Sequence, residues 1–121
     1  MAEHNELGKF GEELAVAFLQ QNGYEILETN WTFQKAEIDI IAQKSSIGKK
    51  EVLFIQCKRY SNKIGSPYIR DLLGTVTSAK ATKGSLISSS EFTKEAIKFA
   101  EENPCLELIG FKNLNKLLNM H

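Results

Sequence analysis

Two short apolar segments on either side of a polar turn constrain the fold of this 121-residue chain more than any other feature. The segments Glu37–Ala42 and Val52–Arg59 are rich in aliphatic residues, and the mostly polar stretch 45–50 that joins them contains Gly48. This pattern predicts two antiparallel β-strands joined as a hairpin. Asp39 lies among the isoleucines of the first strand, where a carboxylate is unfavourable unless it has a partner or a metal ion.

Successive side chains of a β-strand point to opposite faces, so alternation assigns each residue of the hairpin to a side. In the first strand we expect one face to carry Ile38 and Ile40, and the other to carry Glu37, Asp39 and Ile41. In the second strand one face carries Gln56 and Lys58, and the other carries Cys57 with Leu53 and Ile55. Cys57 is therefore interpreted as a small core residue and not as a nucleophile.

Helix and strand patterns continue on both sides of the hairpin. Helices are predicted at 5–21, at 66–79, from Ser90 or Thr93 to Glu101, and at 111–120, and further strands at 24–30, 84–88 and 106–109. Ser66 is expected to cap the second helix, with Pro67 as its first residue. The resulting order, α-β-β-β-α-β-α-β-α, predicts an α/β fold in which a mixed sheet of about five strands has helices on both faces.

The composition is that of an ordinary globular protein, with 42% hydrophobic and 25% charged residues. The length suits a single domain over residues 1–121. No apolar run approaches the roughly 20 residues of a membrane span, and the first residues are acidic and polar, unlike a signal peptide. The two cysteines and two histidines lack the spacing of a metal site. We therefore expect a cytoplasmic protein with neither a membrane nor a small organic cofactor as partner.

Basic residues are concentrated in one stretch, although the formal net charge of the chain is zero. Residues 58–84 contain six lysines and arginines against the single acid Asp71, which gives a net charge of +5, whereas 1–57 carry −4 and 85–121 carry −1. Such a stretch can create a local positive field that attracts nucleic acid, or it can be an ordinary solvated surface. Charge alone leaves both interpretations open.

Asp39, Gln56 and Lys58 can converge at one end of the sheet if the two hairpin strands are neighbours. Mg²⁺ prefers oxygen ligands and keeps several waters, so a charged oxygen from Asp39 and a neutral oxygen from Gln56 suit it. Lys58 would lie near the attacking water or the phosphate, whose growing negative charge it would offset. Because glutamine is a weaker ligand than glutamate, the site needs another carboxylate, from Glu12 or Glu37. The spacing is a loose pattern, and each of these side chains can also be an ordinary surface residue.

The hairpin and its surroundings resemble the catalytic core of the PD-(D/E)xK nuclease superfamily. The segments 36–42 (AEIDIIA) and 52–60 (VLFIQCKRY) are similar to the Mrr-type restriction endonuclease catalytic domain, whose members often carry Q-x-K in place of E-x-K. Near the N-terminus, 8–12 and 26–31 are similar to YraN-like proteins and archaeal Holliday junction resolvases. The resemblance to the Mrr-type domain extends to three later segments, 63–74, 86–96 and 106–118.

The resemblance implies a restriction-endonuclease-like fold and a metal-dependent endonuclease that hydrolyses DNA phosphodiester bonds. It implies catalytic roles for Asp39, Gln56, Lys58 and Glu12. It also implies a Mg²⁺ site, in which Mn²⁺ can substitute, formed by Asp39 and Gln56 with Glu12 or Glu37. No separate DNA-recognition domain is expected within 1–121, so any specificity would come from DNA structure, a dimer or a partner protein.

Basic residues next to the proposed catalytic strand are the expected DNA contacts. They would hold phosphates without reading the base sequence. Lys80 and Lys83 can belong to the same surface or to a solvated helix face. Because cutting both strands of a duplex needs two active sites, we expect a homodimer. The expected DNA-binding residues are Arg59, Lys63 and Arg70, with Tyr60 beside them.

Other functions remain open at this point. The chain can be a structure-selective nuclease that acts on DNA junctions, or a catalytically silent DNA-binding module of the same fold in which Gln56 marks a decayed site. It can also be a structural subunit whose basic face docks an acidic protein. Ala36 departs from the family pattern, in which a glycine usually precedes the acidic motif.

Overall fold

The computed structural model describes residues 2–33, 36–58, 62–110 and 113, with side chains at 12–32, 37–58, 62–110 and 113. The predicted order of elements is confirmed as far as the fifth strand, and the helix predicted at 111–120 lies outside the described residues except for position 113. No helix in the described part of the chain has the length and apolar character of a membrane span. The elements are α1 (Ala2–Gln21), β1 (Glu25–Phe33), β2 (Ala36–Ser46), β3 (Lys49–Lys58), α2 (Ser66–Ser78), β4 (Lys83–Ser88), α3 (Lys94–Glu101) and β5 (Leu106–Gly110).

The five strands form one mixed sheet in the order β1-β2-β3-β4-β5. β1, β2 and β3 are antiparallel neighbours, whereas β3, β4 and β5 run parallel. The β2–β3 hairpin closes through a two-residue turn, Ile47–Gly48, in which Gly48 adopts a positive φ of 74° that few other residues tolerate. α2 and α3 provide the crossovers that parallel strands require. The mixed sheet predicted from the sequence is therefore confirmed.

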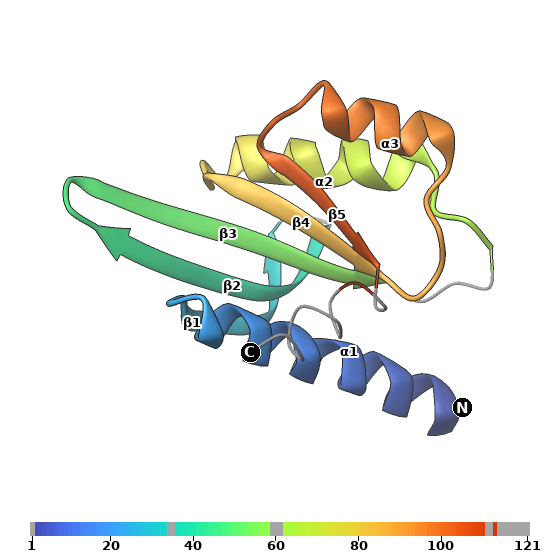
Figure 1. Ribbon diagram of the computed structural model, residues 1–121, viewed down its shortest axis with the longest axis horizontal. Helices are drawn as coiled ribbons and strands as arrows, with labels where there is room; N and C mark the ends of the chain where they lie inside the picture. The colour runs from blue at the N-terminus through green and yellow to red at the C-terminus, as the bar shows by residue number, and fades with distance from the viewer. Residues whose placement is uncertain (1, 34–35, 59–61, 111–112, 114–121) are drawn as a thin grey trace.

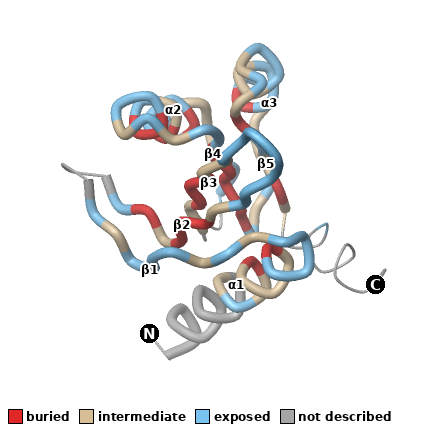
Figure 2. Tube along the Cα trace, turned by 90° about the vertical axis from the view of Figure 1, so that its left-hand side faces the viewer, coloured by how far each residue is buried: buried red, intermediate tan, exposed pale blue. Residues whose placement is uncertain are grey.

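Helices cover both faces of the sheet, with α1 on one side and α2 and α3 on the other (Figure 1). Figure 2 shows that the buried positions follow the inner strands, whereas β1 and the outer sides of the helices are exposed. The core beneath α1 contains Leu53 and Ile55 with Cys57 packed against them, as predicted. The core beneath α2 and α3 comprises Ile38, Ile41, Phe54, Ile64, Ile69, Leu72, Val76, Leu86, Ala96 and Leu106.

The predicted alternation of β2 is wrong at one point, because Ile38 and Ile40 lie on opposite faces. Ile38 packs beneath α2 and α3, whereas Ile40 packs beneath α1. The break lies at Asp39, just beyond the point where the pairing of β2 with β3 ends at Ile40, although the pairing of β2 with β1 continues in register there. Across from this point, Asn30 of β1 has a positive φ of 54°. Beyond Ile40, β2 is therefore paired with β1 alone, and the alternation of its side chains is broken at Asp39.

Helix α2 begins one residue away from the predicted cap. Gly65 occupies the N-cap position with extended backbone and no side-chain capping bond, so Ser66 is the first helical residue and Pro67 the second. Tertiary pairing sets this boundary, because the N–H of Ile64 donates to the carbonyl of Glu91 at 2.8 Å. Of the two residues predicted as possible starts of α3, Ser90 and Thr93, the structure has Thr93 at the N-cap position. Its Oγ1 accepts a hydrogen bond from the N–H of Ala96 at 3.1 Å.

Gly84 allows α2 to lie close against β4, and a side chain there is expected to destabilise the fold. A Cβ added at Gly84 would lie 2.7 Å from Cγ2 of Val76 and 3.1 Å from Cγ of Leu72. We expect Gly84→Ala to lower the free energy of unfolding by about 1–3 kcal/mol, because both packed side chains must move. Gly74→Ala is the matched control, since an added Cβ there meets nothing within 4 Å and should stabilise the helix by about 0.5–1 kcal/mol. Urea denaturation followed by circular dichroism measures both, and an equal change in the two variants would contradict the packing argument.

Candidate active site

The candidate site lies where β2 and β3 separate. Their regular pairing runs from Ser46 opposite Lys49 to Ile40 opposite Ile55 and then ends. Beyond that point two side chains bridge the strands: Oδ2 of Asp39 accepts a hydrogen bond from the backbone N–H of Cys57 at 2.6 Å, and Nε2 of Gln56 donates to the backbone carbonyl of Glu37 at 2.7 Å. Polar side chains thus supply partners for backbone groups that the ladder no longer pairs.

The contact of Gln56 with Glu37 fixes the orientation of its amide. A backbone carbonyl can only accept a hydrogen bond, so the amide atom that faces it must be the NH₂ group. The carbonyl oxygen Oε1 is consequently the Gln56 atom that is not engaged with Glu37. Gln56 therefore offers a neutral oxygen donor while its nitrogen ties the two strands together.

The Asp39 carboxyl is half-buried, and burial is the main reason why its pKa lies above the ordinary value. The hydrogen bond from Cys57 and the positive charge of Lys58 lower this pKa, whereas the charge of Glu37 raises it. Because the pKa is higher in the folded chain than in the unfolded chain, ionisation of Asp39 opposes folding. The stability that this group contributes is complete below its unfolded pKa and is lost as pH rises through the folded pKa.

Glu12 approaches Asp39 from the helix that covers this face of the sheet. Positions 12, 15 and 19 lie on one stripe of α1, and Ala15 and Leu19 are buried in the core beneath it. The pKa of Glu12 is raised by burial and by the negative charge of Asp39, so the two carboxylates interact electrostatically. Glu13, the next residue along the helix, is exposed. The structure therefore places Glu12, the helix residue expected from the sequence, on the face of α1 that is turned toward the candidate site.

Lys58 is the last residue of β3 and lies at the carboxyl ends of the parallel strands. It is opposite Ser88 of β4, and its backbone carbonyl accepts a hydrogen bond from the N–H of Ser89 at 3.2 Å. Its ammonium nitrogen lies 5.7 Å from the centre of the Tyr68 ring in the first turn of α2. No local sequence pattern predicts this contact, because it depends on how α2 packs against the sheet.

Cys57 packs as a core residue, in agreement with its predicted role. Burial raises the pKa of its thiol far above the usual range, and the negative charges of Asp39 and Glu12 raise it further. The thiol therefore stays protonated at neutral pH and is a poor nucleophile. The atom of Cys57 that contributes to the candidate site is its backbone nitrogen, which donates the hydrogen bond to Asp39. No residue pattern predicts this bond, because it forms only where the two strands separate.

The oxygen donors gathered here suit a hard divalent cation. Asp39 and Glu12 supply carboxylates, and Gln56 supplies a neutral oxygen. Among the side chains that the structure describes, no three His, Cys, Asp or Glu residues gather closely enough to hold an ion by themselves. Mg²⁺ does not need such a cage, since it is commonly bound by one or two carboxylates and keeps several waters. The exposed Glu37 contributes its backbone carbonyl to Gln56 and its charge to the field at Asp39.

The basic residues predicted to contact DNA do not all lie beside the candidate site. Arg70 on α2 places its guanidinium 5.3 Å from the centre of the Phe99 ring on α3. Lys83 forms an ion pair with Glu51 at 3.1 Å and lies opposite Leu53, five residues from Lys58 along β3. Five residues span roughly 16 Å, so Lys83 is not beside the site. Arg59 and Tyr60 lie outside the described residues.

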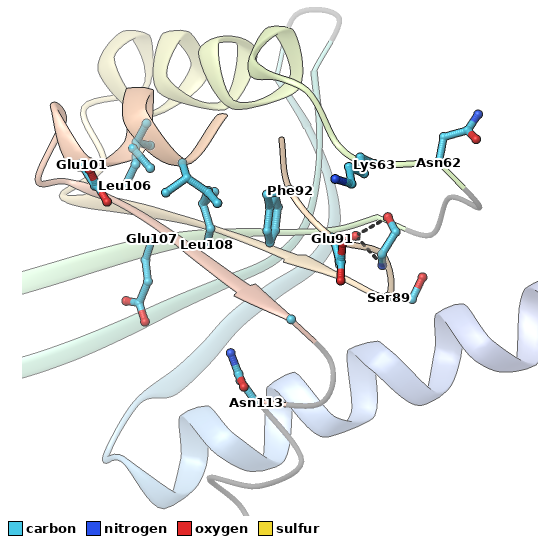
Figure 3. A pocket seen from close by; sticks show the side chains of 15 residues that line it. Asn62, Lys63, Ser89, Glu91, Phe92, Glu101, Leu106, Glu107, Leu108 and Asn113 are labelled. Atoms are coloured by element: carbon cyan, nitrogen blue, oxygen red, sulfur yellow. Dashed lines mark hydrogen bonds between the residues drawn. The ribbon is translucent and has the colours of Figure 1, made fainter. Parts of the chain in front are cut away.

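Lys63 is exposed and lies at one end of a cavity of about 1150 Å³ between α3, β4 and β5 (Figure 3). Asn62 lies at the same end of the cavity, beyond Lys63. The cavity is also lined by Glu91, Glu101 and Glu107, so its acidic residues outnumber its single lysine. Its interior therefore suits phosphate groups poorly, and only Lys63 at its mouth remains a candidate for phosphate contact.

Bacterial relatives match part of the chain. The chain is 65% identical to the UPF0102 protein FP2501 of Flavobacterium psychrophilum over 68 residues, which are 55% of this chain and 54% of that protein. It is 47% identical to a UPF0102 protein of Chlorobium chlorochromatii over 76 residues, 62% of this chain and 52% of that protein. Each match thus spans about half the length of the relative.

Solved nuclease structures share the fold. A repair endonuclease from Pyrococcus abyssi matches with a TM-score of 0.67 and 17% identity, over 89% of this chain and 47% of that one. The MspJI restriction endonuclease, solved in complex with a 27-mer oligonucleotide, matches with a TM-score of 0.70 and 15% identity, over 96% of this chain and 30% of that one. The restriction-endonuclease-like fold predicted from the sequence is therefore confirmed.

The family assignment rests on a longer match. A family model described as restriction endonuclease (Mrr_cat) matches residues 5–118. That range contains the helix, the hairpin and the parallel strands that together form the candidate site. The chain therefore belongs to the family of Mrr-type restriction endonuclease domains.

Proposed function

We propose that this protein is a metal-dependent DNA endonuclease that hydrolyses phosphodiester bonds at the site where β2 and β3 separate. The observation that carries the proposal is the shared electrostatic environment of Asp39, Glu12 and Lys58 at that point. Two carboxylates whose pKa values are raised, with a lysine beside them, form an arrangement that a divalent cation and a phosphate would complete. The family of the chain and its fold agree with this chemistry.

Asp39, Glu12 and Oε1 of Gln56 would hold the ion, with Mg²⁺ as the expected metal and Mn²⁺ as a substitute. When bound, such an ion polarises a phosphoryl oxygen and lowers the pKa of a coordinated water. The chain's own contribution is to keep these oxygens in place. The N–H of Cys57 holds Asp39, and the carbonyl of Glu37 holds the amide of Gln56.

Lys58 would act on the phosphate side of the site. A phosphodiester gains negative charge on its oxygens as water attacks, and a nearby ammonium group stabilises that charge. The hydrogen bond from Ser89 to the carbonyl of Lys58 anchors the end of the strand that carries the ammonium group. Lys58 can also orient the attacking water through an N–H donor.

The form of the DNA substrate belongs to the same proposal. Cutting both strands of a duplex with one site per chain requires two copies, and we propose a homodimer for that reason. Linear duplex, methylated duplex and a four-way junction, each incubated with Mg²⁺, with Mn²⁺ and with a chelator, would separate a general endonuclease from a junction-selective one. Equal cleavage of all three would favour the general endonuclease.

Asp39→Asn is expected to abolish cleavage while preserving the fold. Asparagine keeps an oxygen that can accept from the N–H of Cys57 but loses the charge that attracts a metal ion, so activity should fall at least about 100-fold. The melting temperature near pH 7 should be equal to or higher than that of the unsubstituted chain, because the unfavourable ionisation at this position is removed. Plasmid cleavage and calorimetric titration with Mn²⁺ measure the loss, and a variant that still cuts would refute the role of Asp39.

Lys58→Ala is expected to slow cleavage by at least about 100-fold with little effect on DNA affinity, because the lost charge acts mainly in the transition state. Lys63→Ala is the matched control, since Lys63 is an exposed lysine five residues along the chain. The control should raise KM a few-fold and leave kcat nearly unchanged. Steady-state cleavage with fluorescence anisotropy in chelator separates the two effects. Similar losses of kcat in both variants would argue against a specific role for Lys58.

Gln56→Glu is expected to lower the stability of the fold and to raise the affinity for a metal ion. A carboxylate cannot donate to the carbonyl of Glu37, so the variant loses that hydrogen bond and its free energy of unfolding should fall by about 1 kcal/mol. Saturating Mg²⁺ should then raise its melting temperature more than it raises that of the unsubstituted chain. Thermal denaturation with and without Mg²⁺ tests both parts. A variant that is destabilised but insensitive to Mg²⁺ would remove Gln56 from the proposed ligand set.

A further inference from the structure

The β2–β3 hairpin extends beyond the rest of the sheet, at the end opposite the candidate active site (Figure 1). β1 reaches only as far as Gln43, and the first β4 residue pairs with Leu53. Residues 44–50 therefore form a two-stranded ribbon whose ladder pairing, in the described part of the chain, is confined to β2 and β3. All seven residues of this ribbon are exposed.

The ribbon is positively charged and ends in an apolar side chain. Lys44, Lys49 and Lys50 lie within seven residues that contain no acid. Ile47 at the turn is fully exposed, with a relative accessibility of 103%, and the positive φ of Gly48 closes the turn behind it. We call residues 44–50 the lysine arm.

The lysine arm contributes little to the stability of the fold. Its exposed side chains bury almost no apolar surface, and an isolated two-stranded ribbon is marginally stable in water. Lys49 and Lys50 pair with Ser46 and Ser45, so no acidic residue stands opposite either of them. At the base of the arm, Glu51 lies opposite Lys44 and forms an ion pair with Lys83. Lys44 also lies over the ring of Tyr24, with its ammonium nitrogen 5.5 Å from the ring centre. The positive charges of Lys49 and Lys50 are thus the ones left for a partner outside the chain.

We propose that the lysine arm binds the phosphates of a DNA duplex, with Ile47 entering a groove, at a distance from the site of cleavage. The choice of DNA as the partner rests on the proposed nuclease function. The positive charge of the arm is complementary to the negative charge of the DNA phosphates. Lys49 and Lys58 are nine residues apart on β3, which corresponds to roughly 30 Å. That length equals about nine base pairs of duplex at 3.4 Å per pair.

The shape of the arm suits a duplex better than a single strand. The major groove admits a two-stranded β-ribbon, and proteins that contact the minor groove often insert an isoleucine or leucine between bases. Lysines flanking such a side chain hold the adjacent phosphates without sequence preference. The arm would therefore add affinity and fix the orientation of the duplex, and the chemistry would take place at the other end of β3.

Binding of a 24-base-pair duplex, measured by fluorescence anisotropy in chelator over a range of salt concentrations, tests the lysine arm without requiring cleavage. Lys49→Gln/Lys50→Gln should weaken binding about tenfold and lower the slope of log affinity against log salt by about 2. Ile47→Ser should weaken binding a few-fold and leave the slope unchanged, because it removes no charge. Lys94→Gln/Lys98→Gln is the matched control, since both lysines are exposed on α3 and the change in net charge is the same.

The outcomes separate the two proposals. Equal losses in the arm variant and the control would mean that only net charge matters and would overturn the lysine arm, as would unchanged binding by the arm variant or no binding by the unsubstituted chain. Loss of binding confined to the arm variants would support it. If the arm variants lose affinity and the unsubstituted chain fails to cut DNA with Mg²⁺ or Mn²⁺, the nuclease proposal falls and the lysine arm stands.

Discussion

The separation of β2 from β3 after Ile40 and Ile55 is the constraint on which the candidate site depends. If the ladder continued, the backbone groups of Cys57 and Glu37 would find partners within it, and polar side chains would not be needed between the strands. Because the strands part, Asp39 and Gln56 supply the missing hydrogen-bond partners. The requirement to satisfy backbone groups therefore holds the oxygen atoms in the place where a metal ion is proposed to bind.

The electrostatics of the site oppose the stability of the fold. Burial is the main cause that raises the pKa values of Asp39 and Glu12, so both carboxyl groups ionise less readily than they would in water. The negative charge of Glu37 adds to the rise at Asp39, and that of Asp39 adds to the rise at Glu12. The positive charge of Lys58 offsets part of the rise in the pKa of Asp39. The two apolar cores on either side of the sheet keep the groups together despite their repulsion. Functional sites commonly sacrifice stability in this way.

Sequence patterns predicted the side-chain directions that depend on one strand or helix alone, and failed where contacts between elements decide them. The alternation of β3 is confirmed for Cys57, because β3 stays paired with β4 as far as Lys58. Glu12 was expected from the family resemblance, and it lies on the same stripe of α1 as the buried Ala15 and Leu19. The alternation of β2 was wrong at Asp39 because the pairing with β3 ends at Ile40, a tertiary feature that the residues of β2 alone do not reveal. The contact of Lys58 with α2 likewise depends on residues that meet only after folding.

The hydrogen bond from Cys57 to Asp39 would also limit how tightly the proposed metal ion is held. Oδ2 of Asp39 accepts this hydrogen bond, so Oδ1 is the oxygen that would be free of it and through which Asp39 would bind the proposed ion. Gln56 offers one oxygen as well, since its nitrogen is directed to Glu37. An octahedral ion bound through single oxygens of Asp39, Gln56 and Glu12 would retain about half of its hydration shell. Such an ion would exchange readily with solvent, so the occupancy of the proposed site would follow the free magnesium concentration around the protein.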